Sequence, residues 1–198
     1  MLRTFLFILS LIYAGPSFCA SPAHFAISTS RTVITLSWVM LSTHPSQAIL
    51  SQVSGDVFLD PQQSQRDRVE VRIPVSSLEA SNMLLTHQLK SSLFFDERHY
   101  PWVTFTSQKI SASANGQLKI FGLLTIRNIQ RQVVLEAVMA QAHPERLNQP
   151  LTLHAHTAIS RTAFAMDNLL SLVGDTINID IDIAAQPLST TGARMLAG

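Results

Sequence analysis

Two histidines that stand two residues apart, His154 and His156, are the side chains whose type and spacing could hold a metal ion. Alternate residues of a β-strand point to the same face, so both imidazoles could reach one Zn²⁺. A third ligand would have to come from another segment, for which the candidates are Asp180, Asp182 and His143. A metal-dependent enzyme using His154 and His156 is therefore one interpretation. The other is a pair of solvent-facing histidines, because the leucine and isoleucine side chains of this segment lie on the opposite face.

Other catalytic chemistry has less support in the sequence. Asp180 and Asp182 share a face of one strand, yet alternating acids on the outside of a final strand are more simply a device for solubility. There is no Gly-x-Ser-x-Gly motif and no glycine-rich phosphate loop, and the single cysteine is Cys19. We therefore predict a protein that is not an enzyme, with no catalytic residue, no metal and no cofactor.

The charge balance excludes one class of partner. Lysine and arginine together number 14 against 13 acidic residues. A nucleic acid needs a basic face for its phosphates, and there is no net excess of charge to build one, so we expect no nucleic-acid partner. The turn from Arg127 to Arg131 is a local basic feature. It could meet an anionic headgroup or a membrane surface, and the alternative is a solvated hairpin turn.

The N-terminal segment has the pattern of an export signal. Arg3 precedes an apolar run at 5–14, about ten residues, which is too short to span a bilayer and typical of a signal-peptide core. Small residues at the −3 and −1 positions favour a cut after Cys19, and a cut after Ala20 is the neighbouring option, although it places the bulky Phe18 at −3. The alternatives are a lipidated Cys19 and an ordinary apolar helix. We expect a periplasmic or secreted protein that is formally neutral and free of cysteine once residues 1–19 are removed.

Most of the remaining chain alternates apolar and polar residues, which predicts β-strands. About eight are expected, at residues 34–40, 53–59, 69–75, from 103 into the Asn115-Gly116 hairpin signal, and at 118–126, 133–139, 151–159 and 177–183. A capping box from Ser76 to Glu79 begins the one expected helix, around residues 76–92. These elements predict an all-β antiparallel barrel or sandwich over residues 20–186, followed by a loose tail at 187–198.

In an eight-stranded barrel the apolar faces of all strands converge on one lumen, which is either filled by side chains or able to hold a small ligand. The candidates for lumen contacts are Trp38, Phe105, Leu124, Leu135 and Ile181. Small residues on the apolar faces favour free space in the lumen, and these are Gly55, Gly122, Ala137 and Ala155. The alternative is that the same side chains form a closed core.

From residue 85 to residue 135 the chain resembles the YceI-like family of secreted polyisoprenoid-binding proteins. An ordered series carries the resemblance: Leu89, Lys90, Ser91, Phe94, Phe95, Tyr100, Pro101, Phe105, Ser107, Gly122, Leu124 and Thr125. The family's closing motifs resemble Arg161, Phe164, Val173, Gly174 and Asp175. The resemblance implies an antiparallel, eight-stranded, lipocalin-like barrel with one inserted α-helix, which holds a long isoprenoid in its lumen.

Several polar positions of the family are changed in this chain. Leu85-Thr86 replaces an Arg-Asp pair, Gln88 stands at a histidine position, and Leu123 and Asn128 replace an acid and a glycine. The changes remove polar groups and keep the apolar frame, which indicates a divergent member whose headgroup contacts differ from those of the family.

The predicted function is therefore that of a periplasmic or secreted lipid-binding protein. It would hold a long-chain isoprenoid, a polyprenyl phosphate or quinone-type lipid, for carriage or storage. Transient membrane contact and a homodimer are compatible with this function. The alternatives are a secreted β-barrel interaction module without a ligand and the metal-dependent enzyme described above.

Overall fold

The computed structural model describes residues 22–41, 43–113, 116–140, 149–169 and 171–188. The strands within these ranges are β1 (Ala23–Ile27), β2 (Val33–Met40), β3 (His44–Leu50), β4 (Ser54–Leu59), β5 (Arg68–Pro74), β6 (Glu79–Ala80), β7 (Trp102–Ala112), β8 (Gln117–Ile126), β9 (Ile129–Met139), β10 (Leu151–Ser160) and β11 (Thr176–Pro187). The α-helix is α1 (Met83–Lys90), and short 3₁₀ turns are η1 (Ser64–Arg66), η2 (Val75–Ser77) and η4 (Thr162–Phe164).

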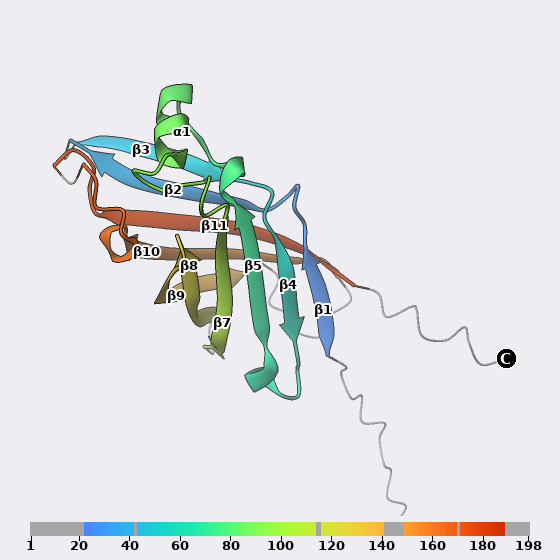
Figure 1. The fold of residues 1–198 in the computed structure, drawn as a ribbon. Coiled ribbons are helices and arrows are strands. Elements are labelled where there is room, and N and C mark those ends of the chain that lie inside the picture. The colour runs from blue at the N-terminus through green and yellow to red at the C-terminus, as the bar shows by residue number, and fades with distance from the viewer. Residues whose placement is uncertain (1–21, 42, 114–115, 141–148, 170, 189–198) are drawn as a thin grey trace, which may run out of the picture.

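Eight antiparallel strands form a closed barrel, as expected from the sequence (Figure 1). Their order is β1-β4-β5-β7-β8-β9-β10-β11, and β1 pairs with β11 to close the ring. β11 is long enough to serve two partners along one edge. Residues 185–187 of β11 pair with β1, and residues 178–182 pair with β2, from which β3 and β6 continue the sheet. β2, β3 and β6 therefore extend the sheet beyond the closed ring on one side of the barrel.

Three strands lie outside the eight that the alternation predicted. β1 has the alternating pattern over five residues, with Phe25 and Ile27 buried, and it closes the ring. β3 buries only Ala48 and Leu50, so most of this strand has no apolar periodicity to detect. β6 is two residues long. Short or half-exposed strands depend on their neighbours in the sheet, and these neighbours are absent from a local sequence pattern.

The predicted start of the helix at Ser76 is wrong, because α1 begins after Asn82 and spans only Met83–Lys90. The Asn82 side chain accepts a hydrogen bond from the Leu85 amide at 2.9 Å and so caps the helix. The residues of the expected capping box are used differently. Residues 75–77 form a 3₁₀ turn, and Glu79 pairs with Ile49 as part of β6.

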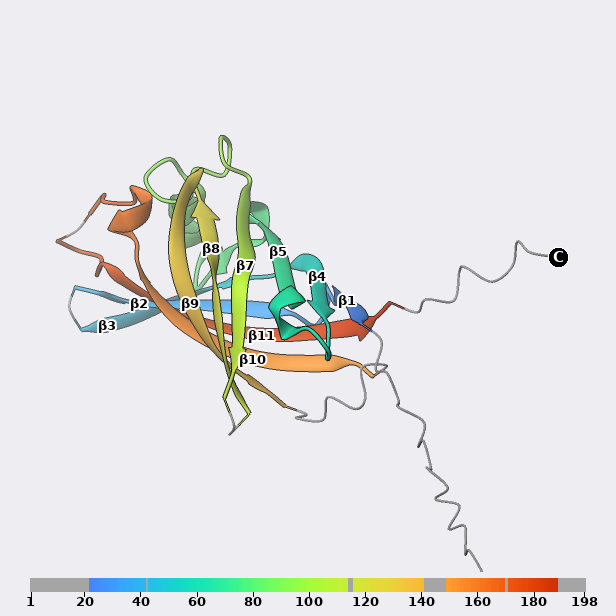
Figure 2. The same cartoon turned by 90° about the horizontal axis from the view of Figure 1, so that it is seen from below.

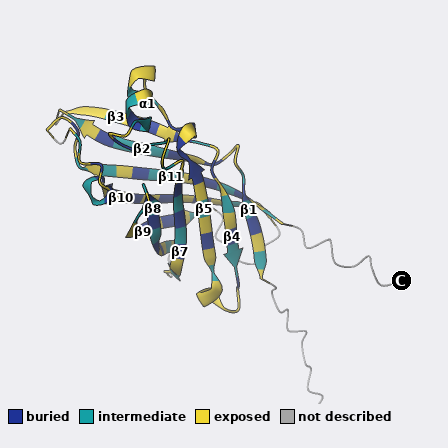
Figure 3. Cartoon of the chain, in the orientation of Figure 1, coloured by how far each residue is buried: buried dark blue, intermediate teal, exposed yellow. Residues whose placement is uncertain are grey.

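Burial follows the two faces of each barrel strand (Figure 3). In β10, exposed and buried residues alternate from Thr152 to Ser160, and all the buried side chains face the interior. The β7–β8 hairpin forms where it was predicted, with Ala112 opposite Leu118. Gly116 of its turn has a φ of 80°, whereas Asn115 lies outside the described residues.

Two predicted boundaries fall at the ends of the chain. Residues 1–19, predicted as a signal peptide, lie outside the described residues, as does the tail from 189 onward. Pro187, expected to begin that tail, instead ends β11 and pairs with Phe25. None of the helices in the described ranges is long and apolar enough to cross a bilayer.

Candidate binding cavity

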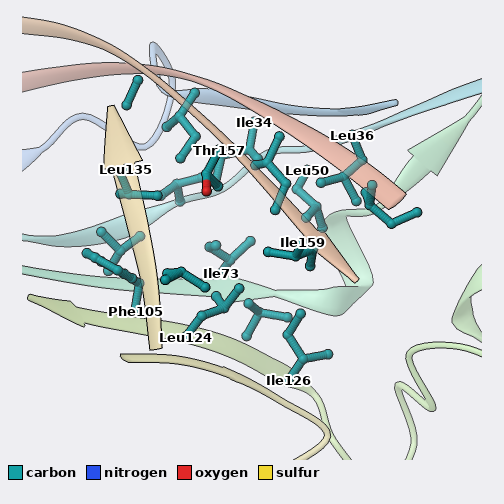
Figure 4. Close-up of a pocket in the computed structure, with 18 of the residues that line it drawn as sticks. Ile34, Leu36, Leu50, Ile73, Phe105, Leu124, Ile126, Leu135, Thr157 and Ile159 are labelled. Atoms are coloured by element: carbon teal, nitrogen blue, oxygen red, sulfur yellow. The ribbon is translucent and has the colours of Figure 1, made fainter. Parts of the chain in front are cut away.

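The barrel encloses an apolar cavity of about 110 Å³ (Figure 4). Side chains from β2, β3, β5 and β7 to β11 form its wall, and one end is covered by α1 and the loops that follow α1 and β10. The loop and helix residues of this covering are Leu89, Phe94, Phe95, Arg161, Met166 and Val173. Among the described residues, every other residue of the wall is apolar except Thr157. The cavity therefore offers contacts to a hydrocarbon and almost none to a polar group.

The five residues that were predicted from the sequence to face the lumen all line this cavity: Trp38, Phe105, Leu124, Leu135 and Ile181. The first four are buried and Ile181 is half-buried. They come from five different strands, so only the closure of the barrel brings them together. Their contact with a ligand stays a prediction.

The expectation that small residues open the lumen holds for one position of the four. Ala155 lines the cavity, whereas Gly55, Gly122 and Ala137 do not. At Gly122 the space left by the missing side chain is taken by the Phe105 ring, whose Cζ would lie 2.5 Å from an added Cβ. A small residue on an inward face thus accommodates a large neighbour here and does not enlarge the cavity.

Arg161 closes the covered end of the cavity from within the core, where it is only 1% exposed. Its guanidinium donates to four backbone carbonyls: Gly174 at 3.0 Å, Asn168 and Val173 at 2.8 Å each, and Met166. Burial lowers its pKa, opposed by the charges of Asp175 and Asp167. An arginine stays a cation in proteins, so the four carbonyls are what compensate its lost hydration.

The same arginine also holds the loops in place. Its guanidinium carbon lies 5.8 Å from the centre of the Phe94 ring, within cation–π range. Asn168, whose carbonyl it binds, donates from its side chain to the Leu93 carbonyl at 2.9 Å. The sequence marked Arg161 and Phe94 only through family resemblance, because loops carry no strand periodicity that would identify residues facing the lumen.

The two histidines proposed as metal ligands lie on the outside of the barrel, each beside an aspartate of the next strand. His154 Nδ1 lies 2.8 Å from Asp182 Oδ1, and His156 Nδ1 lies 2.9 Å from Asp180 Oδ1. All four side chains are well exposed. In the described part of the chain no three His, Cys, Asp or Glu side chains are grouped so as to hold a metal ion, and His143 lies outside that part.

The basic turn between β8 and β9 is a tight hairpin. Arg127 and Asn128 have φ angles of 52° and 59°, as a two-residue turn of type I′ requires. Arg127 donates to the Ala165 carbonyl at 2.5 Å, which fastens the turn to the loop after β10. Arg131 donates to the carbonyl of its neighbour Gln130 at 3.0 Å and remains exposed. The two arginines therefore differ in how firmly they are held.

Comparison with curated proteins finds relatives of moderate similarity. A UPF0312 protein of Vibrio campbellii is 29% identical over 84 residues, which are 42% of this chain and 44% of that protein. A UPF0312 protein of Vibrio vulnificus is 24% identical over 133 residues, 65% of this chain and 69% of the relative. The chain thus spans less than half the length of the first of these relatives.

Solved structures share the fold. The structure of Burkholderia cenocepacia BcnA superposes with a TM-score of 0.71 at 21% identity, covering 81% of this chain and 99% of BcnA. A Campylobacter jejuni YceI protein gives 0.61 at 24% identity, over 72% of this chain and 84% of that one. A polyisoprenoid binding domain from Saccharophagus degradans, implicated in plant cell wall breakdown, gives 0.61 at 10% identity, over 83% of this chain and 98% of that domain.

The profile of the YceI-like domain matches residues 23–185, which include every strand of the closed barrel except for the last two residues of β11. The match agrees with the ordered series of residues from 85 to 135 and with the barrel that these residues build. The chain therefore belongs to the YceI-like family.

Proposed function

We propose that this barrel binds the apolar chain of an isoprenoid-type lipid in its lumen and holds it without chemical conversion. The observation that carries the proposal is the cavity wall, whose described residues are apolar apart from Thr157 on β10 and Arg161 at the covered end. Burial of hydrocarbon yields about 0.8 kcal/mol per CH₂, so such a wall can bind a chain through its length alone. The polyisoprenoid binding domain of Saccharophagus degradans, which has the same fold, is a precedent for this class of ligand.

The size of the cavity limits what fits in this conformation. Its volume is about 110 Å³, and an engineered protein cavity of about 150 Å³ is known to hold one benzene molecule. The lumen as it stands therefore has room for a short segment of a chain. A long isoprenoid, such as a polyprenyl phosphate or a quinone-type lipid, requires the lining side chains to move apart as it binds.

The proposal includes export. The basic start and short apolar run at residues 1–19 support delivery to the periplasm or the medium, where such a protein would carry or store a lipid. Cell fractionation of the full chain and of a chain lacking residues 2–19 tests this part. We expect only the full chain outside the cytoplasm, and equal distribution of the two would contradict export.

Lipid extraction tests the central claim. Protein purified from its native host under mild conditions is extracted with organic solvent, and the extract is analysed by mass spectrometry. We expect a long-chain isoprenoid at close to one mole per mole of protein. An extract without lipid would instead favour a barrel that serves as an interaction module.

A further inference from the structure

The pairing between β9 and β10 stops halfway along the barrel. It runs from Leu153 opposite Met139 to His156 opposite Glu136 and goes no further. β10 nevertheless continues to Ser160 and β9 continues back to Ile129. Among the described residues, these segments pair with β11 and with β8, respectively, and not with each other. Figure 2 shows the two strands separating toward the end of the barrel that carries the loop after β10. The wall of the barrel is thus split on one side.

Side chains bridge the split in place of backbone hydrogen bonds. The Thr157 hydroxyl donates to the Val134 carbonyl at 2.9 Å, at the point where the pairing ends. The 3₁₀ turn η4 contacts both strands, and its Phe164 is buried. Side chains change rotamer on a far shorter timescale than a sheet unpairs, so this part of the wall is the easiest to open.

A groove of about 650 Å³ lies along the split. It is lined by Gln108, Phe121, Gly122, Arg131, Gln132, Val133, Val134, Thr157, Ala158, Ile159, Ser160, Ala163 and Phe164. Three of these residues, Val133, Thr157 and Ile159, also line the lumen. One layer of side chains therefore separates the groove from the apolar cavity.

The groove combines a cation with apolar surface. The Arg131 side chain is exposed, and among the described residues it bonds the Gln130 carbonyl and forms no ion pair. Gln108, Gln132 and Ser160 add hydrogen-bonding groups, and the described lining contains no acid. Phe121 and Val134 are large apolar side chains left 37% and 40% exposed beside these groups. This composition suits an anionic group attached to a hydrocarbon.

We propose that the groove binds the anionic head of a single-chain amphiphile, whose hydrocarbon chain passes between β9 and β10 into the lumen. The inference rests on the proposed function, because it assumes that the lumen takes a hydrocarbon chain. It also explains how a hydrocarbon chain larger than the volume of the closed cavity is accommodated. A split wall that opens sideways can admit a chain that the closed lumen cannot hold.

A disulfide across the split tests the route. In a Cys19→Ser background, Val134→Cys with Ala158→Cys places one cysteine on each side, because continued pairing would set residue 158 opposite 134. The matched control is Val138→Cys with His154→Cys, on the same two strands where they are already paired. The probe is parinaric acid, a fluorescent single-chain carboxylate, and the measurement is its association rate by stopped flow.

We expect the oxidised disulfide across the split to slow uptake at least about tenfold and reduction to restore it, while the control disulfide has no effect. Equal rates for both disulfides with normal binding by the wild type would overturn the route and leave the proposed function intact. If the wild type binds no parinaric acid and yields no lipid on extraction, both the route and the proposed function are contradicted.

A second pair of variants tests the head site without any cross-link. Arg131→Gln should weaken binding of parinaric acid about tenfold, the order expected for a lost charge-assisted hydrogen bond, and leave binding of its uncharged methyl ester unchanged. Arg127→Gln is the control, since that arginine is engaged with the Ala165 carbonyl and does not line the groove. Equal affinities of wild type and Arg131→Gln for the acid would show that the head binds elsewhere.

Discussion

The ring of Phe105 lies against the backbone of Gly122, in the strand position that a side chain would otherwise occupy. A Cβ built on Gly122 would lie 2.5 Å from the ring Cζ and 2.6 Å from the Thr106 carbonyl oxygen. Real carbon atoms do not approach so closely, so any other residue at this position must displace the ring or the strand. Phe105 also lines the cavity, which links this contact to the shape of the lumen.

Gly122→Ala should therefore destabilise the barrel. Overpacking of this kind costs about 1–3 kcal/mol of unfolding free energy. Urea denaturation followed by tryptophan fluorescence measures it. The loss should shrink in a Phe105→Leu background, because the ring clash is then gone, whereas an equal loss in both backgrounds would place the strain elsewhere.

Arg161→Met should unfold more readily than any exposed arginine variant. The substitution keeps an apolar stem and leaves the four carbonyls, Gly174, Met166, Asn168 and Val173, without their donor. Each buried carbonyl left without a donor costs about 1–3 kcal/mol of unfolding free energy. Thermal and urea unfolding measure the change. Arg131→Met, at an exposed position whose side chain bonds only the adjacent Gln130 carbonyl among the described residues, is the control and should differ from wild type by about 0.5 kcal/mol or less.

Asp175 should contribute stability that depends on pH. Hydrogen bonds from the Ser160 hydroxyl and the Thr162 amide hold the pKa of Asp175 below its usual 3.8. A lowered carboxyl pKa means that the folded state prefers the ionised form, so the contribution is present above pH 3.8 and is lost as the pH falls through the folded-state pKa.

The comparison is between wild type and Asp175→Asn, unfolded in urea from pH 7 down to pH 2, in steps of about one unit. The gap between their unfolding free energies should be widest at neutral pH and narrow in acid. Burial raises the pKa of Asp67, which gives the opposite trend, but this is common to both proteins and cancels in the difference. A gap that stays constant with pH would contradict the assignment.

Ala155→Leu should reduce lipid binding without changing the fold. Ala155 is fully buried and lines a cavity of about 110 Å³, so a leucine side chain there takes much of the remaining space. We expect less lipid per mole of protein in the organic extract. Thr152→Leu adds a leucine to the exposed face of the same strand and serves as the control. Undiminished lipid in Ala155→Leu would mean that the chain binds outside the lumen.

His154 and His156 offer a direct test of the metal alternative. Their aspartate partners lie on the neighbouring strand, and no third metal-binding side chain among the described residues joins either pair. We expect protein incubated with Zn²⁺ and then gel-filtered to retain no stoichiometric metal by elemental analysis. Stoichiometric zinc in the wild type that disappears in His154→Ala/His156→Ala would instead establish a metal site.

Alternation of apolar and polar residues was enough to predict the barrel strands with a complete inward face, as in β10 and β11. It failed where a strand is short or half-exposed, as in β3 and β6. It also placed the start of the helix too early, because Ser76 and Glu79 satisfy a capping pattern locally while Glu79 pairs with Ile49 of β3. A local pattern carries no information on which distant strand a residue will pair with.

The same distinction between local pattern and tertiary packing applies to the candidate site. The sequence alone determined which side chains face inward, because the period of a strand sets the face, and so Trp38, Phe105, Leu124, Leu135 and Ile181 were identified as lining the lumen. Only the tertiary structure decided the volume between them, the burial of Arg161 among carbonyls, and the early end of the β9–β10 pairing. These depend on how segments far apart in the chain pack against one another, and packing distances are not encoded in the period of any single strand.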